Sequence, residues 1–529
     1  MKESRKVLLF TVILAAVLFI SVMITSHVTR EILDEDTSGD LLLANCLYEE
    51  KTLLPDDWFF GNEYRIYSQL IWAPFFGLFS DWGTVRFCGT LVIQLLYLLS
   101  FVFMMRSASL KKSTVLFGCI LLLIPYCVSY GRIMLYHSHY TLYITFAFLI
   151  LGFIFRLRGK DTADGKQFPG IMKWILPAVC CVFSSLSGIR EIYIFLGPLC
   201  ALVFWQLVVS RKKDFLVPAL FCFAMGAAGW FINRFVILKA IRVGVENSSR
   251  IEYLGLSKVY MTLFAIFRQF GYRSGVDRGS FFGIMSLAGI IVSVYVLILS
   301  GKALFTEKNS TLQVLKGMLL VQLAINFVTF LFYEPPHSSR YDYSRYLVPS
   351  SVWVIPLLCC MAEEKKTLLR HWLYAVICAV FIGNGMLNAA FFRDPDRFTQ
   401  DYDGLAYHTT DTVEIYSGAV DFLQKNGYDL GYAVYDANVL IEKMNGLPVV
   451  WLDKTVDGGL IYRDLLTRRS YREISGKKPF FIGFQNEAAS FRALPCSEGS
   501  EPVFSDDNVY IYELKDQAAF KEYLDLHSN

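Results

Sequence analysis

The sequence predicts a polytopic α-helical membrane protein with a small α/β domain at its carboxyl-terminal end. Of its 529 residues, 54% are hydrophobic and the mean hydropathy is +0.42, which is typical of membrane proteins and rare in soluble domains. Apolar runs long enough for a helix to cross a bilayer recur as far as residue 392. Beyond that point charged residues become frequent and apolar runs become short.

We expect about 11 membrane spans in residues 1–392, because a crossing helix needs about 20 apolar residues. Two of them, Thr114–Tyr130 and Ile171–Leu186, are short for this purpose. The apolar segment Ile66–Phe79 is shorter still and contains Pro74, so we expect it to lie in the outer interface or to re-enter the membrane. The expected spans are Val7–His27, Gly83–Met105, Thr114–Tyr130, Ile133–Phe155, Ile171–Leu186, Ile192–Val209, Phe215–Val236, Phe281–Ser300, Leu312–Tyr333, Tyr346–Met361 and Trp372–Phe392.

The distribution of charge predicts the orientation. Lys2, Arg5 and Lys6 precede the first span, and every later loop expected on the same side carries at least two Lys or Arg residues. Because basic loops stay in the cytoplasm, the amino terminus is expected inside and, with an odd number of spans, the tail outside. A multi-pass protein of the plasma membrane is therefore expected. The formal net charge of only +3 gives no reason to expect nucleic acid as a partner.

Residues 393–529 are expected to form the extracytoplasmic α/β domain, since a segment of this length can bury its own core. Asn445-Gly446 is a turn signal between two of its expected strands. The expected elements are a helix at Val420–Asn426, strands at Gly431–Tyr435, Val449–Leu452, Phe480–Phe484 and Val509–Glu513, and a closing helix at Gln517–Leu526.

The first outer loop, residues 28–81, is rich in acidic residues. A carboxylate here suits an enzyme that removes a proton from a polar acceptor beside a lipid-borne donor. Asp40 is the preferred base, because it directly precedes an apolar stretch, Leu41–Tyr48, that is expected to be helical. Asp34 or Asp36 could carry this role instead, or could hold a divalent metal together with Asp40. An aspartate at the start of a helix is also an ordinary N-cap.

Cations near the outer surface are candidates for binding the phosphate of a lipid carrier, whose negative charge grows as its bond to the sugar breaks. The candidates are Arg132, His137, His139, Arg190 and Arg345. Arg190 lies between two apolar spans, and an ion pair with the adjacent Glu191 is the alternative explanation for it. Tyr346 and Trp58 are candidates for contacts with the sugar or the acceptor, although aromatic residues are common at membrane interfaces in any case.

Several motifs recur in an order that resembles the GT-C superfamily of membrane glycosyltransferases. The first outer loop contains Asp40-x-x-x-Ala44, then Leu53-Leu54-Pro55-Asp56-Asp57-Trp58, and then the apolar segment Ile66–Phe79. Later, Ser344-Arg345-Tyr346-Leu347-Val348-Pro349 is similar to an Arg-Tyr-Leu-x-Pro element that opens a late span in those enzymes. The tail segment Gly431–Asn438 resembles tails of bacterial members. Two features depart from the pattern: the common Asp-Glu pair occurs only as Asp34-Glu35, and the second outer loop has no acid.

The resemblance includes the protein O-mannosyltransferases and the lipid A aminoarabinose transferases. It implies a glycosyltransferase with a polyprenyl-phosphate sugar as donor and inversion at the anomeric carbon. The acceptor would be an envelope glycan, lipid or protein at the outer face of the cytoplasmic membrane. The resemblance implies no particular cofactor, and the binding of a divalent metal is an open alternative. The alternatives are a lipid-linked glycan transporter or flippase, an O-antigen-type polymerase or ligase, and a non-catalytic envelope protein. Polar groups crowded at one face favour the enzyme over the transporter.

Overall fold

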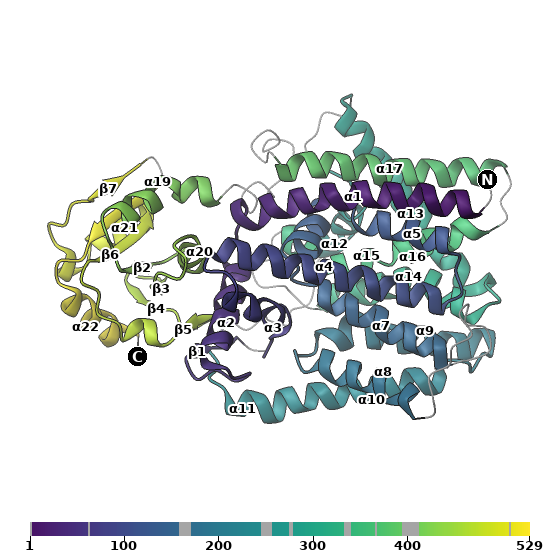
Figure 1. Cartoon of the computed structure of the whole chain (residues 1–529), viewed down its shortest axis with the longest axis horizontal. Helices are drawn as coiled ribbons and strands as arrows, with labels where there is room; N and C mark the ends of the chain where they lie inside the picture. The colour runs from purple at the N-terminus through teal and green to yellow at the C-terminus, as the bar shows by residue number, and fades with distance from the viewer. Residues whose placement is uncertain are drawn as a thin grey trace. The chain divides into compact units, whose positions relative to one another are not determined.

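The computed structural model describes residues 3–61, 64–157, 171–244, 256–273, 279–332, 340–364, 368–393, 412–506 and 509–528 (Figure 1). It divides into two compact units. Unit 1 comprises Met1–Ser26, Leu91–Val236 and Asn247–Tyr407, and unit 2 comprises His27–Thr90, Ile237–Glu246 and His408–Asn529. The expected domain boundary at residues 392 and 393 borders segment 394–411, which lies outside the described residues.

Unit 1 is a bundle of apolar helices that run alongside one another (Figure 1). A membrane allows this arrangement, because a helix satisfies its own backbone hydrogen bonds. Helices α1 (Glu3–Glu31) and α4 (Trp82–Ser107) contribute residues to both units. The other helices of unit 1 are α5 (Lys112–Leu122), α6 (Val128–Tyr130), η2 (Gly131–Tyr136), α7 (Thr141–Leu157), α8 (Met172–Ser185), η3 (Ile192–Leu196), α9 (Gly197–Ser210), α10 (Leu216–Ile232), η4 (Asn233–Ile237), α12 (Leu256–Arg268), α13 (Phe281–Thr306), α14 (Ser310–Phe332), α15 (Arg340–Ser351), α16 (Val354–Glu363) and α17 (Leu368–Arg393).

The chain is a multi-pass membrane protein, but the expected number of about 11 spans is not confirmed. Among the described residues, 8 helices are long and apolar enough to cross, or 9 if one pair bent by 78° counts as a single span. That pair is Val128–Tyr136 with Thr141–Leu157. The two expected spans that were short in the sequence fall on α5 and α8, which have only 11 and 14 residues. A helix of that length covers only part of the bilayer thickness.

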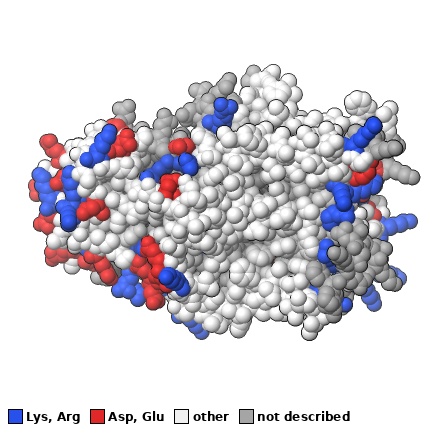
Figure 2. Space-filling model, viewed as in Figure 1, with Lys and Arg blue, Asp and Glu red and all other residues white. Residues whose placement is uncertain are grey.

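Polar contacts join three of the loops that the sequence predicts on one side of the membrane. Glu307, between α13 and α14, accepts hydrogen bonds from Lys212 at 3.0 Å and from Lys316 at 2.5 Å. Lys316 also pairs with Glu364, which follows α16, at 2.6 Å. The alternation of loops in unit 1 is therefore consistent with the sequence pattern. Figure 2 shows a largely uncharged surface over α1, α4 and α17, and charged side chains near the start of α1.

Helices α8 and α10 cross closely because glycine lies at the crossing. A Cβ atom added at Gly229 would lie 2.4 Å from the backbone oxygen of Val182, which cannot move aside without shifting α8. Small residues allow such close approach between membrane helices. We expect Gly229→Ala to lower the free energy of unfolding by about 1–3 kcal/mol through overpacking.

The thermal unfolding midpoint of the detergent-solubilised chain measures this effect. Gly301→Ala is the matched control, since its added Cβ would meet only the end of the Leu320 side chain, at 3.3 Å. An unchanged midpoint in Gly229→Ala would contradict the tight crossing.

Unit 2 is built around a six-stranded sheet with the order β4-β3-β2-β6-β8-β7. Strands β3, β2 and β6 are parallel, whereas β4, β8 and β7 pair antiparallel with their neighbours. The strands are β2 (Leu430–Ala433), β3 (Val449–Lys454), β4 (Leu460–Tyr462), β6 (Pro479–Phe484), β7 (Phe504–Ser505) and β8 (Val509–Glu513). The helices are α19 (Thr412–Lys425), α20 (Ala437–Lys443), α21 (Gln485–Arg492) and α22 (Gln517–His527).

Helices cover both faces of this sheet. Phe480 packs against Tyr428, whose ring in turn contacts Phe422 of α19. The next residue, Phe481, stacks at 4.4 Å on Phe491 of α21. Since successive side chains of a strand point to opposite faces, this alternation places α19 and α21 on opposite sides. The small sheet domain that the sequence predicts is confirmed, with α20, α21 and three short strands that it did not predict.

The first loop folds together with the tail in unit 2. Its elements are α2 (Glu35–Glu50), β1 (Trp58–Phe59), α3 (Tyr67–Trp72) and the 3₁₀ turn η1 (Ala73–Gly77), and α11 (Leu238–Ala240) also belongs to this unit. Strand β1 pairs antiparallel with β5 (Thr467–Arg468) of the tail. Arg468 reinforces this contact through an ion pair with Glu49 at 2.6 Å. The acidic loop is therefore a folded part of the sheet unit.

Candidate functional site

Helix α2 begins earlier than the sequence predicts, and this changes the meaning of the three candidate aspartates. The helix was expected from Leu41, directly after Asp40, but it starts at Glu35. Asp34 is its N-cap, and its carboxylate accepts hydrogen bonds from the backbone and the hydroxyl of Thr37, both at 2.8 Å. The capping role that we considered for Asp40 therefore belongs to Asp34.

Asp40 lies within α2 and is held by a neighbouring helix. It is half-buried, and its Oδ1 accepts a hydrogen bond of 2.6 Å from the side-chain amide of Gln69, a buried residue of α3. Asp36 stands four residues earlier, on the same face of the helix. The amide of Gln69 therefore fixes the direction of the Asp40 carboxylate.

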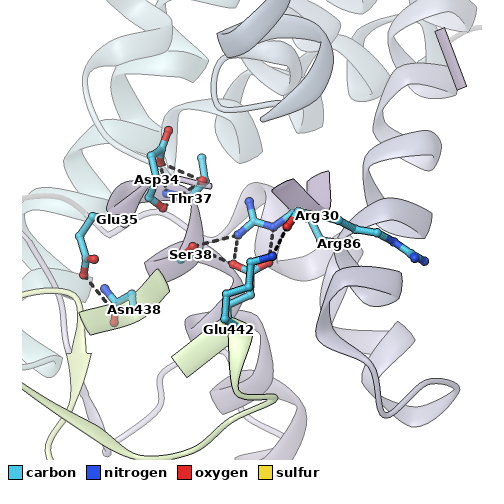
Figure 3. A network of polar contacts seen from close by, with 9 residues as sticks. Arg30, Asp34, Glu35, Thr37, Ser38, Arg86, Asn438 and Glu442 are labelled. Atoms are coloured by element: carbon cyan, nitrogen blue, oxygen red, sulfur yellow. Dashed lines mark hydrogen bonds and ion pairs between the residues drawn. The ribbon is translucent and has the colours of Figure 1, made fainter. Parts of the chain in front are cut away.

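The sequence drew attention to Glu35 only as part of the Asp34-Glu35 pair, but in the structure this residue contacts the tail. Its Oε1 accepts a hydrogen bond from the backbone amide of Asn438 at 3.1 Å (Figure 3). Burial, followed by the charge of Asp436, raises the pKa of the Glu35 carboxyl well above its usual range. Burial also raises the pKa of Asp436 to about 6, although a hydrogen bond from Tyr416 opposes this. Two carboxyl groups with high proton affinity therefore lie together, and Asp34 adds a third charge.

The stability of unit 2 should accordingly depend on pH. Asp436 binds its proton more tightly in the folded chain, with a pKa of about 6, than at its ordinary value of 3.8. As pH rises through this interval, the unfolded chain loses its proton first, so the free energy of unfolding falls. Glu35 acts in the same direction. We expect the thermal unfolding midpoint to decrease over this range, and Asp436→Asn to flatten the decrease. Identical pH curves for the two proteins would contradict this account.

A buried ion pair joins α2, α4 and α20 (Figure 3). Arg86 of α4 is fully buried and pairs with Glu442 of α20, where its Nε donates to Oε1 at 2.7 Å. Ser38 of α2 donates to the other carboxylate oxygen at 2.7 Å. Nearby, the ring of Trp72 lies 5.7 Å from the Arg86 guanidinium. Since both charges are removed from water, each depends on the other for its compensation.

Three of the five candidate phosphate ligands come together in unit 1. Nη2 of Arg345, on α15, lies 3.2 Å from Nε2 of His139. The rings of His139 and Tyr140 meet edge-on at 5.0 Å, and the guanidinium of Arg190 lies 5.8 Å from the centre of the Tyr140 ring. Two of the three stand at an interruption of a helix: His139 at the 78° bend before α7, and Arg190 just before the π-turn η3. Arg345 lies within the helix α15.

Arg132 and His137 lie in the same bend but are buried. They are only 3% and 2% exposed, and the amide of His137 donates to the carbonyl of Arg132 at 2.8 Å. Glu191, the residue that the alternative explanation pairs with Arg190, is buried, and neither of its carboxylate oxygens has a hydrogen-bond partner among the described residues.

The two candidate aromatic contacts differ in accessibility. Tyr346 is half-buried and packs against Phe330, with ring centres 6.4 Å apart. Trp58 is only 1% exposed, in β1 of unit 2. A sugar would therefore reach Trp58 only after a rearrangement of this strand.

The candidate aspartates Asp34, Asp36 and Asp40 are not arranged to bind a divalent metal. Within the described ranges, no group of three or more His, Cys, Asp or Glu side chains is arranged so that it could hold a metal ion. Asp34 already uses its carboxylate for capping, and Asp40 is held by Gln69. We therefore derive no step through a metal.

Comparison with known proteins gives a likeness in structure only. No protein-family model matches the sequence, and no curated protein matches it. Among solved structures, the chain is similar to ArnT from Cupriavidus metallidurans bound to undecaprenyl phosphate, with a TM-score of 0.57 and 10% sequence identity over 96% of this chain and 98% of that one. The apo state of the same protein gives a TM-score of 0.52 and 11% identity over 95% and 97%. The fold of this chain thus resembles that of ArnT, as the sequence motifs predicted.

Proposed function

We propose that this protein is a glycosyltransferase that takes a sugar from a polyprenyl-phosphate carrier. The observation that carries the proposal is the likeness to ArnT along nearly the whole chain, together with the undecaprenyl phosphate in that structure. The cluster of Arg345, His139 and Arg190 supports it, because these side chains suit a phosphate. A fold alone hosts several activities, so the residues of the site carry the rest of the argument.

The cluster of unit 1 would bind and stabilise the leaving group. As the bond between the anomeric carbon and the phosphate oxygen breaks, the electron pair stays on the phosphate. The guanidinium groups of Arg345 and Arg190 offer fixed donors to that growing charge. His139, in contact with Arg345, orients the guanidinium or adds a further donor. Arg132 and His137 lie deeper in the same bend and support its shape.

Asp40 would act as the base. The acceptor hydroxyl or amine attacks the anomeric carbon, a new bond forms there, and the acceptor proton passes to the Asp40 carboxylate. Attack opposite the leaving phosphate inverts the configuration. Gln69 is a positioning residue, since its amide holds one carboxylate oxygen at 2.6 Å. Asp36, on the same helix face, is the second candidate for the base.

We further propose that the reaction takes place at the outer face of the cytoplasmic membrane, with the amino terminus inside and unit 2 outside. The basic loops of the sequence support this orientation. An envelope glycan, lipid or protein would then be the acceptor. The proposal commits to no particular sugar.

Binding of undecaprenyl phosphate to the purified full chain tests the proposal. We expect Arg345→Gln to weaken that binding about 10-fold or more, the effect of losing a charge-assisted hydrogen bond of about 1.5–3 kcal/mol. Arg5→Gln, at an exposed position of α1, is the matched control and should bind normally. No measurable binding, or equal binding by Arg345→Gln, would contradict the assignment. Stronger competition by undecaprenyl diphosphate would point to a polymerase or ligase instead.

A further inference from the structure

The carboxyl edge of the sheet in unit 2 has the topology of a ligand site. Strands β2 and β6 are parallel neighbours at the centre of the sheet. From β2 the chain continues through α20 to β3 on one side, and from β6 through α21 to β7 and β8 on the other. The chain thus extends the sheet in one direction after β2 and in the opposite direction after β6. In open α/β sheets, ligands bind outside the carboxyl ends of the strands at this reversal.

Aromatic and acidic side chains gather at this edge, which we call the edge cluster. Tyr435 follows β2, is 54% exposed, and has its ring centre 6.4 Å from that of Phe484 at the end of β6. Tyr416 of α19 lies 5.9 Å from the same phenyl ring and donates its hydroxyl to Asp436 at 3.2 Å. The edge cluster consists of Glu35, Tyr416, Tyr435, Asp436, Phe484 and Glu487.

Oxygen atoms at this edge lack donors. Oε2 of Glu35 and Oδ1 of Asn438 are buried and have no hydrogen-bond partner among the described residues, and Asn438 as a whole is 0% exposed. A carboxyl group can accept hydrogen bonds from a ligand in either protonation state. Burial raises the pKa values of Glu35 and Asp436, and the charge of Asp436 raises that of Glu35 further. A ligand that brings several hydroxyl groups would offer donors to the carboxyl groups of the edge cluster.

A sugar ring complements the edge cluster in two ways. Its hydroxyls are donors to carboxylates, and its apolar face packs on an exposed aromatic ring such as that of Tyr435. A divalent cation fits less well, because no three acidic side chains of the described residues are arranged to hold one.

We infer that the edge cluster binds a glycan, which is the acceptor of the proposed transfer. The role as acceptor rests on the proposed function, whereas glycan binding itself does not. Glu35 and Asp40 belong to the same helix, and their positions are about 7.5 Å apart along its axis. Since five residues also turn the helix by about 140°, a glycan held at the edge cluster would have to pass around α2 to bring its end to Asp40. The sheet domain would select the acceptor, and α2 would present it to the base.

The test is binding of the detergent-solubilised full chain, without any lipid donor, to an array of bacterial surface oligosaccharides. We expect binding to at least one glycan, reduced about 10-fold or more by Tyr435→Ala and by Asp436→Asn. Tyr523→Ala, at a half-buried tyrosine of the same unit outside the cluster, is the control and should bind normally. Asp436→Asn retains the shape of the side chain, so its loss of binding would not reflect misfolding.

The same preparations are measured with undecaprenyl phosphate. Retained lipid binding in Tyr435→Ala, together with lost glycan binding, supports the inference. Glycan binding that is absent from the wild type, or equal in wild type, Tyr435→Ala and Asp436→Asn, overturns it. If the wild type binds glycan through Tyr435 but does not bind undecaprenyl phosphate, the proposed function fails while the glycan site stands.

Discussion

Asp40→Asn should lower the rate of sugar transfer by about 10²–10⁴-fold, the usual contribution of a positioned general base. The asparagine side chain has the same shape and can still bond to Gln69, but it cannot accept the acceptor proton. Undecaprenyl phosphate affinity should remain unchanged, because the phosphate cluster lies on other residues. Transfer of labelled sugar in isolated membranes, with lipid binding measured in parallel, separates the two effects.

Two further variants distinguish Asp40 from its neighbours. Asp34→Asn should retain most activity, since asparagine caps a helix as well as aspartate does. Asp421→Asn, at an exposed position of α19, serves as the control for surface charge. If Asp40→Asn transfers sugar at the rate of the control, Asp40 is not the base. A selective loss in Asp36→Asn would then assign the role to the next turn of the helix.

Glu442→Gln should destabilise unit 2 by about 3–5 kcal/mol, because it leaves the buried guanidinium of Arg86 without its counter-charge. This is the largest stability effect that we expect from a single conservative substitution in this chain. The loss should appear as a lower thermal unfolding midpoint. Glutamine keeps only one acceptor oxygen, for which Ser38 and Arg86 would compete, so α2 should become less well anchored.

The double variant Arg86→Met with Glu442→Leu provides the matched comparison. Replacement of a buried ion pair by apolar side chains is often close to neutral, so the double variant should recover most of the lost stability. Glu473→Gln removes an exposed pair with Arg469 and should change the free energy of unfolding by less than about 1 kcal/mol. Equal midpoints for Glu442→Gln and Glu473→Gln would show that the Arg86 pair does not stabilise unit 2.

The membrane helices and the central strands could be predicted because their signals are local. An apolar run of sufficient length can satisfy its backbone in lipid only as a helix, and α13 and α14 follow directly from this rule. Strand β8 coincides with the predicted segment Val509–Glu513. Helices α5 and α8 are too short to cross the membrane, and the apolar runs that predicted them were the two shortest among the first five expected spans.

The sequence contains a capping signal for the start of α2. Asp34 precedes Thr37 by three residues, and its carboxylate caps the backbone amide of that residue. The apolar run begins only at Leu41, so hydropathy predicts a helix start six residues too late. Polar residues in a first turn carry capping information that hydropathy does not.

The ion pair of Arg86 with Glu442 illustrates what the sequence does not contain. The two residues are 356 positions apart, and no local pattern relates them. One signal was nevertheless present, since Arg86 lies inside the expected span Gly83–Met105, and an ionisable residue in a span calls for a partner. Its partner could be identified only once the first loop and the tail were seen to fold as one unit.

An experimental structure of the full chain with undecaprenyl phosphate bound tests the central claim most directly. The account predicts that phosphate oxygens lie within hydrogen-bond distance of Arg345, near His139 and Arg190, on the same side of the membrane as Asp40. A phosphate group bound away from Arg345, His139 and Arg190 would contradict it.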